Sequence, residues 1–205
     1  MEAASWSRLK HGDGERCYSR RTMCPMCWAL DAKSSPLQHF TSAVMPCGGP
    51  LAMLHGDGGM RGSRMQVFTG AGGLLSAWDW DYGRVRKLGW TPASELVSVL
   101  ETGRVMVWSL QGARVADFGL GQACEQQGVL MCEFLTDGLV VLTSAFQLVA
   151  LLSFSHQRLV PLPDPRLSSP PSAMCCLERP ASERSPRSPE VLLATASKTI
   201  LRVDE

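Results

Sequence analysis

The sequence predicts an all-β fold, and three observations lead to that class. Short apolar runs of four to six residues, separated by Gly, Ser, Thr or Asp, recur from residue 50 onward. Long runs with the 3.6-residue spacing of a helix do not occur. Four strand pairs begin near Pro50, Leu96, Leu139 and Val191, so they are separated by 46, 43 and 52 residues. Because this period is close to that of one four-stranded blade, the expected architecture is a β-propeller.

Each strand pair is predicted to be an antiparallel hairpin. The pairs are PLAMLH with RMQVFTG, LVSVL with RVMVWSL, LVVLT with FQLVALLSF, and VLLATA with TILRVD. Weaker strands flank the pairs. In the second unit RVRKLGW would be the innermost strand and RVADFGL the outer edge, and in the third unit VLMCEFL and RLVPLP take these places. We therefore expect blades of four antiparallel strands.

The predicted organisation is an N-terminal segment with the first strands at 1–46 and a partial propeller at 47–205. The blades are expected near 47–80, 83–120, 128–163 and 173–205, and a stretch rich in Pro, Ser and Arg predicts an exposed loop at 163–190. One small sheet buries its faces only against neighbouring blades. About four blades fit in this length, so we expect an incomplete propeller.

The composition argues against nucleic acid or membrane as a partner of the whole surface. The 20 basic and 19 acidic residues leave a net charge of +1, which supplies no field to attract polyanions. The longest apolar stretch, GLVVLTSAFQLVALLSF, is interrupted by polar residues and is interpreted as two strands instead of a membrane span. The first residues lack the apolar region of a secretory signal. We expect a cytosolic chain with reduced cysteines.

Several glycines and tryptophans suggest structural roles in the blades. Gly103 in ETGRV suits a tight turn, and Gly89 before Trp90 suits a close approach between blades. Trp90 and Trp108 are then expected to pack between blades.

The CPMC motif, Cys24 to Cys27, offers the sharpest chemical alternative, because CxxC pairs bind zinc or exchange thiols. A closed zinc site needs two further ligands, and none of the other cysteines repeats the spacing. A redox role needs the motif between a strand and a helix, whereas the surrounding residues suggest a strand. Ordinary buried or half-buried thiols are the favoured interpretation.

No other motif predicts a catalytic, cofactor or metal site. The stretch GDGGMRG at 56–62 lacks the GK[ST] ending of a phosphate loop, and GAGG at 70–73 is followed by an expected strand instead of a helix. The four histidines are scattered. Asp79 and Asp81 in WDWD are interpreted as turn residues.

The segment GGPLAML followed by QVFTGAGGLLSAWDWDYGRVRKLGWTPASELVSVLETGRVMVWSLQG resembles the amino-terminal propeller of the vacuolar protein sorting-associated protein 16 family. The family pattern has GGP before a strand, then GxVxxLGW, a glutamate before the next strand, and VxExGxVxVYxLxG. The matching residues with a structural role in the blades are Gly48, Gly49, Pro50, Gly89, Trp90, Glu95, Gly103 and Gly112, with Trp108 at the tyrosine place. The CPMC motif lies where this family has an ordinary strand.

The resemblance implies a non-catalytic scaffold subunit of a vesicle-tethering complex of the HOPS or CORVET kind, acting in endosome-to-vacuole or lysosome transport and fusion. It implies no cofactor, class C subunits as partners, and a cytoplasmic location peripheral to late endosome, vacuole or lysosome membranes. In the family, a Sec1/Munc18-like partner docks on a C-terminal solenoid that these 205 residues do not include. Members are several times longer, so the chain resembles an amino-terminal fragment.

Two other functions stay open at this stage. One is a small zinc or thiol protein centred on Cys24 and Cys27, and the other is a propeller that binds an unrelated partner. The loops HGDGGMRGSR and RPASERSPRSP are the expected variable contact surfaces, although no binding residue can be assigned to either.

Overall fold

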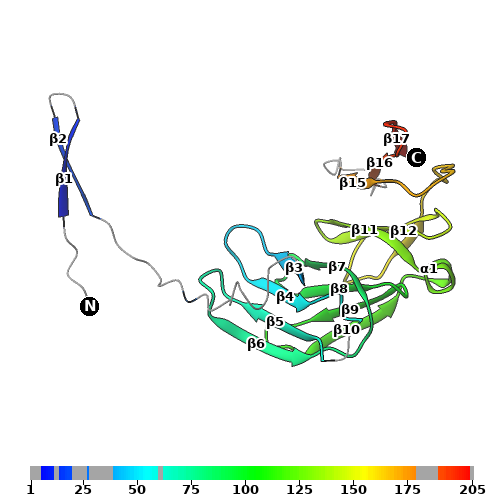
Figure 1. The fold of residues 1–205 in the computed structure, drawn as a ribbon, viewed down its shortest axis with the longest axis horizontal. Coiled ribbons are helices and arrows are strands. Elements are labelled where there is room, and N and C mark those ends of the chain that lie inside the picture. Colours follow the sequence, from blue (N-terminus) through cyan, green and yellow to red (C-terminus); the bar gives the residue numbers. More distant parts are fainter. Residues whose placement is uncertain are drawn as a thin grey trace.

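The computed structural model describes residues 6–11, 14–19, 27, 39–59, 62–178 and 189–203. Within these residues the chain forms a two-stranded hairpin, three antiparallel sheets of four strands and one antiparallel sheet of three strands (Figure 1). The prediction of an all-β fold is therefore confirmed.

The first four-stranded sheet is a meander of β3 (Phe40–Val44), β4 (Leu51–His55), β5 (Arg64–Phe68) and β6 (Leu74–Asp79). It begins at Phe40, earlier than the first blade expected from residue 47. Strand β3 was missed because its sequence, FTSAV, buries only Ala43 and so carries little apolar signal. The division into an N-terminal segment and a partial propeller otherwise stays a prediction.

The second and third sheets follow the predicted strand order. The second sheet contains β7 (Val85–Trp90), β8 (Leu96–Leu100), β9 (Arg104–Trp108) and β10 (Arg114–Gly119). The third contains β11 (Val129–Leu135), β12 (Gly138–Thr143), β13 (Leu148–Leu151) and β14 (Leu159–Pro161). A short helix, α1 (Gln122–Gln127), connects them and was not predicted.

The fourth sheet contains β15 (Ala173–Leu177), β16 (Glu190–Ala194) and β17 (Ile200–Val203). The expectation of four strands in every blade is therefore not met by the described part of this sheet. Strand β15 lies within the fourth blade expected at 173–205, at the place where that range overlaps the interval 163–190 expected to be an exposed loop. It forms a strand because Met174 and Cys176 alternate towards the third sheet, where they join an apolar cluster.

The first strands of the chain, β1 (Trp6–His11) and β2 (Gly14–Ser19), pair with each other as a hairpin. Figure 1 shows this hairpin standing apart from the four larger sheets. Cys24 and the loop at 179–188 fall outside the described residues.

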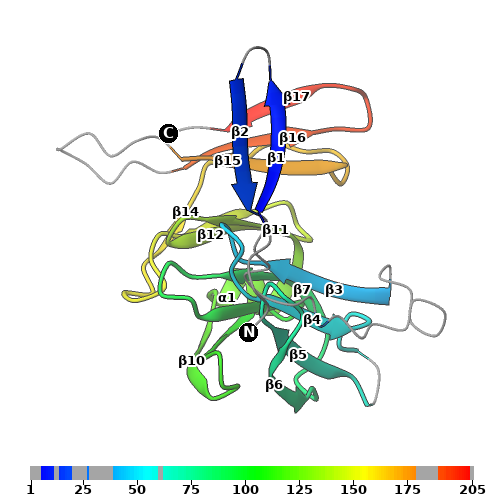
Figure 2. The same cartoon turned by 90° about the vertical axis from the view of Figure 1, so that its left-hand side faces the viewer.

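The core consists of three clusters, each shared by two sheets that follow one another in the chain. The first lies between the sheets β3–β6 and β7–β10, the second between β7–β10 and β11–β14, and the third between β11–β14 and β15–β17. The innermost strands touch in the same succession, β3 with β7, β7 with β11, and β11 with β15. Figures 1 and 2 show the first and fourth sheets at opposite ends of this series. The described sheets form an open arc of blades, which confirms the expected incomplete propeller.

A search of the described residues found no helix with the length and apolar character needed to cross a membrane.

Candidate functional site

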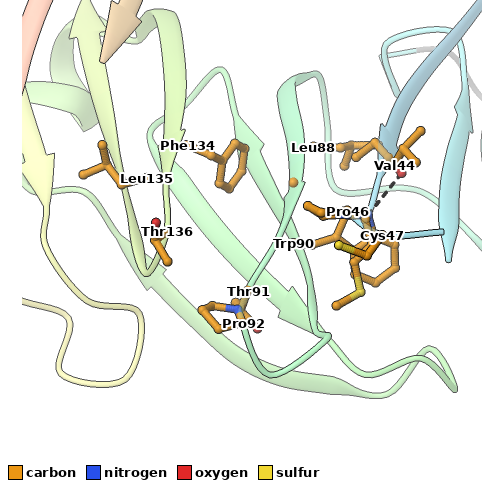
Figure 3. Close-up of a pocket in the computed structure, with 13 residues that line it drawn as sticks. Val44, Pro46, Cys47, Leu88, Trp90, Thr91, Pro92, Phe134, Leu135 and Thr136 are labelled. Carbon is orange, nitrogen blue, oxygen red and sulfur yellow. Dashed lines mark hydrogen bonds between the residues drawn. The ribbon is translucent and has the colours of Figure 1, made fainter. Parts of the chain in front are cut away.

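The inner strands of the first three blades surround an apolar hollow of about 660 Å³ (Figure 3). It lies where β3, β7 and β11 end and their following turns begin. Its lining residues are all uncharged: Ala43, Val44, Met45, Pro46, Cys47, Leu88, Gly89, Trp90, Thr91, Pro92, Phe134, Leu135 and Thr136. The volume is in the range of pockets that accommodate several side chains of a ligand.

Trp90 joins the first blade to the second at one side of the hollow. Its indole Nε1–H donates a hydrogen bond to the backbone carbonyl of Ala43, at 3.1 Å, and the ring remains half-buried. The next residue, Thr91, is buried and starts a turn that closes when its N–H donates to the Glu95 carbonyl at 2.9 Å. Ser94 completes this turn with a φ of 63°. The wall made by Trp90 and Pro92 is therefore fixed by bonds within the chain.

Gly89 allows the third blade to approach the second at the opposite side of the hollow. A Cβ atom at this position would lie 2.5 Å from Cζ of Phe134, a separation that real Cβ atoms do not show. The Phe134 ring thus rests on the bare backbone of β7, with the ring of Phe154 at a centroid distance of 6.3 Å. Figure 3 shows Phe134 and Trp90 facing the space from β11 and β7.

The turn between β3 and β4 forms the rim on the first blade. The Met45 N–H donates to the Pro50 carbonyl at 2.9 Å, and Cys47 and Gly48 both take the left-handed conformation, with φ of 61° and 77°. A Cβ at Gly49 would lie 2.9 Å from the Met45 side chain, so a larger residue would push this turn out of place. The GGP motif therefore sits at the edge of the hollow.

Thr136 forms the rim on the third blade, where the fourth blade holds it in place. The Glu178 carboxylate accepts hydrogen bonds from the Thr136 backbone N–H and from its hydroxyl, the latter at 2.5 Å. The polar groups of Trp90, Thr91 and Thr136 thus already have partners. The hollow can gain free energy chiefly by burying apolar groups.

A second groove, of about 520 Å³, lies next to the hollow and shares the lining residues Thr91 and Pro92 with it. Its other lining residues are Ala93, Glu95, Val107, Val115, Ala116, Asp137, Phe154, Ser155 and Gln157. Asp137 accepts a hydrogen bond from the Ser153 hydroxyl at 3.0 Å, and Glu95 lies 3.5 Å from the Thr91 hydroxyl. Neither carboxylate joins an ion pair within the described ranges, and no basic residue lines the groove.

The remaining predicted blade residues lie away from this surface, at contacts between blades. Gly103, with a φ of 79°, forms the turn between β8 and β9, where a Cβ would lie 2.6 Å from Cβ of Cys124. Gly112, with a φ of 82°, forms the next turn against the Trp78 ring, which a Cβ would approach to 2.7 Å. Both positions combine a left-handed backbone with close packing.

Trp108 anchors an aromatic group between the first and second blades. Its ring centroid lies 5.2 Å from that of Trp78, 5.9 Å from Trp80 and 5.4 Å from Tyr82. Its Nε1–H donates to the buried Ser98 hydroxyl at 3.1 Å. The structure therefore brings Gly48, Gly49, Pro50, Gly89, Trp90 and Glu95 around the hollow and groove, and places Gly103, Trp108 and Gly112 elsewhere.

The residues that sequence reasoning missed at this surface are Val44, Pro92, Phe134 and Asp137. Each comes from a different blade or turn, so no local motif unites them. One sequence feature could have pointed to this surface: a proline lies two residues after the inner strand of both the first and the second blade, as Met45-Pro46 and Thr91-Pro92.

The described residues of the Gly-rich stretch, 56–59 and 62, lie between β4 and β5. Asp57 fixes its start, because its carboxylate accepts the Gly59 N–H at 2.9 Å and pairs with Arg84 at 2.8 Å. These two contacts lower the pKa of Asp57, the Gly59 bond being the larger cause.

The free thiols in the described part of the chain include Cys27, Cys47, Cys124, Cys132, Cys175 and Cys176. Cys27, from the CPMC motif, is exposed, and its backbone N–H donates to the Ala71 carbonyl at 2.7 Å. No group of three His, Cys, Asp or Glu residues in the described part of the chain could hold a metal ion. Burial raises the pKa of Cys176 to about 12, so this thiol is neutral and a weak nucleophile near pH 7.

Comparison with protein families gives a match over most of the chain. The family model described as "Vps16, N-terminal region" matches residues 2–178. The chain is 28% identical over 180 residues to the vacuolar protein sorting-associated protein 16 homolog of Dictyostelium discoideum, covering 80% of this chain and 21% of that protein. It is 26% identical over 174 residues to Protein VACUOLELESS1 of Arabidopsis thaliana, covering 79% and 19%. The chain thus spans about a fifth of the length of these relatives.

Solved structures share the fold at low sequence identity. The computationally designed Ika8 protein gives a TM-score of 0.56 at 16% identity, covering 81% of this chain and 46% of that one. Sqt1 of Saccharomyces cerevisiae gives 0.53 at 10% identity, covering 78% and 43%. The C-terminal WD40 domain of Sif2 gives 0.51 at 14% identity, covering 80% and 42%. These likenesses concern the propeller fold alone.

Proposed function

This chain belongs to the family described as Vps16, N-terminal region, and from that membership we propose that it is a non-catalytic, protein-binding scaffold in vacuolar protein sorting. The match over residues 2–178 is the observation that carries the proposal, because it includes strands β1 to β15 and all residues that line the hollow and the groove. The names of the relatives from Dictyostelium and Arabidopsis point to the same process.

The finer proposal is that the chain acts within a tethering complex of the HOPS or CORVET kind. Its partners are then the class C subunits, and its location is the cytoplasmic side of late endosome, vacuole or lysosome membranes, reached through the complex. A blade arc suits this role because its turns present a continuous surface built from several sheets.

The geometry of the surface supports contact with proteins over chemistry. The hollow contains one thiol, Cys47, and no carboxylate or imidazole that could act on it as a base. Its polar groups bond to neighbouring parts of the chain, as Trp90 does with Ala43 and Thr136 with Glu178. Such a lining favours the burial of apolar side chains from a partner.

Reconstitution with purified class C subunits tests the proposal. The tagged 205-residue chain is mixed with each subunit separately, and the bound protein is measured after washing. We expect retention of at least one class C subunit that itself carries a propeller or solenoid. The Sec1/Munc18-like subunit serves as the negative comparison, because the family docks it on the solenoid beyond these residues. Absence of any bound subunit, with the chain folded by circular dichroism, would contradict the proposal.

A further inference from the structure

We propose that the hollow and the groove together bind one extended peptide segment of a partner protein, which carries apolar anchor residues followed by a basic residue. The inference deepens the proposed function and rests on it, since it names the surface and the chemistry of the partner. Four observations carry it: the two residues that line both cavities, the uncharged hollow, the carboxylates of the groove and the fixed walls.

The hollow selects for apolar side chains. None of its lining residues is charged, and Val44 on its rim is 67% exposed, so its side chain is open to contact by a partner. A charged side chain entering this space would lose its hydration without gaining a partner. Aliphatic or proline side chains lose nothing and bury their surface between Trp90 and Phe134.

The groove selects for a positive charge next to those anchors. Glu95 and Asp137 both line it, and neither has a cationic partner within the residues that the structure describes. The groove has no lysine or arginine of its own. A lysine or arginine of the partner would therefore meet two carboxylates without displacing an existing ion pair.

The shared residues Thr91 and Pro92 set the form of the ligand. They belong to both cavities, so an occupant can pass from one to the other over the β7–β8 turn. The combined volume of the two cavities, about 660 and 520 Å³, favours an extended peptide over one compact small molecule. The walls need little rearrangement on binding, since the Thr91 turn, the Trp90 bond and the Phe134 contact with Gly89 are already formed.

Fluorescence anisotropy with the full 205-residue chain tests the inference. The probe is a fluorescein-labelled peptide of about 12 residues, a length of about 40 Å when extended. It carries leucine, proline and leucine, then a short spacer and one arginine. Two matched peptides replace the arginine by glutamate or the leucines by serine. We expect binding of the first peptide, and affinity at least about tenfold lower for each matched peptide.

Two variants separate the parts of the surface. Val44→Asp places a charge in the hollow and should weaken binding of the arginine peptide about tenfold or more. The double variant Glu95→Gln with Asp137→Asn should weaken it about three- to tenfold and should bind the glutamate peptide no worse than the arginine peptide. Pro46→Asp repeats the hollow test, at an exposed turn residue that lines the hollow and not the groove, if Val44→Asp fails to fold.

Matched controls lie outside both cavities. Leu75→Asp changes an aliphatic residue that is 48% exposed on β6, and Asp81→Asn removes an exposed carboxylate, so neither should alter binding. Equal weakening by Leu75→Asp, equal affinity for all three peptides, or no binding at about 1 mM would overturn the inference. Binding of a fatty acid or detergent in the hollow, without peptide binding, would overturn it as well. Retention of class C subunits by the Val44→Asp variant would leave the proposed function standing while rejecting this surface.

Discussion

The first and third core clusters, each of which joins two neighbouring blades, consist of different kinds of side chains. We refer to the three clusters in order as the first, second and third contacts between blades. The first contact contains Trp78, Trp80 and Tyr82, whose rings all contact that of Trp108, with aliphatic residues around them. The third contains only aliphatic and sulfur residues at its buried centre: Val140, Leu142, Leu148, Ala150, Met174, Val191, Leu193 and Val203. The difference shows that blade stacking depends on filling the space between sheets, whichever side chains fill it.

The two contacts also differ in how strongly each depends on single residues. One aromatic ring at the first contact fills the volume that several aliphatic groups share at the third. Removal of one ring should therefore cost more than removal of one aliphatic side chain. The following predictions test this difference, beginning with the largest effect.

Trp108→Ala should lower the free energy of unfolding by about 3 to 5 kcal/mol, because a buried aromatic side chain is lost from the first contact. The change also removes the hydrogen bond to Ser98. Urea unfolding followed by circular dichroism measures the effect. Leu75→Ala, at an exposed position, serves as the control and should change stability by less than about 0.5 kcal/mol. Unchanged stability of Trp108→Ala would contradict the packing role.

Leu193→Ala should cost about 2 to 4 kcal/mol through a cavity at the third contact. Leu193 is fully buried there, against the third sheet. Hydrogen exchange locates the damage: amides of β15 to β17 should lose protection while amides of β4 and β5 keep theirs. Equal loss of protection in both sheets would show that the contacts do not act separately.

Gly89→Ala should cost about 1 to 3 kcal/mol, because the added methyl group would meet the Phe134 ring at the second contact. Gly89 does not have a positive φ, so the effect arises from packing alone. The double variant Gly89→Ala with Phe134→Leu should recover part of the loss, as measured in a double-mutant cycle. An additive double variant would exclude the contact as the cause.

Alkaline pH should weaken the second and third contacts through their buried cysteines, which the first contact does not contain. Burial raises the pKa of Cys124 from 9.0 to about 11 and that of Cys176 from 9.0 to about 12. The unfolded chain therefore releases these thiol protons first, so the stability present below pH 9 is lost as pH rises from about 9 to about 12.

Urea midpoints measured from neutral pH to about pH 10 test that expectation. Cys176→Ala should reduce the pH dependence relative to the wild-type chain, since one of the thiols is then missing. The same slope in both proteins would assign the effect to other titrating groups.

The sequence allowed most of the strands to be predicted, for a clear physical reason. Strands β8, β9, β12 and β13 are continuous apolar runs that bury nearly every side chain, so periodicity and turn glycines locate them. Strand β3 buries a single alanine, and α1 has only six residues with one buried, Cys124. Elements of this kind are fixed by tertiary contacts and leave a weak local pattern.

The candidate surface could not be predicted from local patterns. Gly89 was expected at a close approach between blades, but its partner Phe134 is 45 residues away and carries no motif. Likewise, Glu95 and Asp137 meet the same groove from the β7–β8 and β11–β12 turns. Such a surface depends on the rotation angle between successive blades, and this angle cannot be predicted from local sequence patterns.

The sequential arrangement of the three core clusters has a consequence for synthesis of the chain. Every residue of the first cluster lies between Ala43 and Trp108, so its two sheets can meet while later codons are still being translated. The cluster between the second and third sheets is complete once Phe154 has left the ribosome. Each of these clusters forms between sheets that are neighbours in the sequence, so a nascent chain can bury its apolar surface one blade at a time. This shortens the time during which unpaired strand edges are exposed to other nascent proteins.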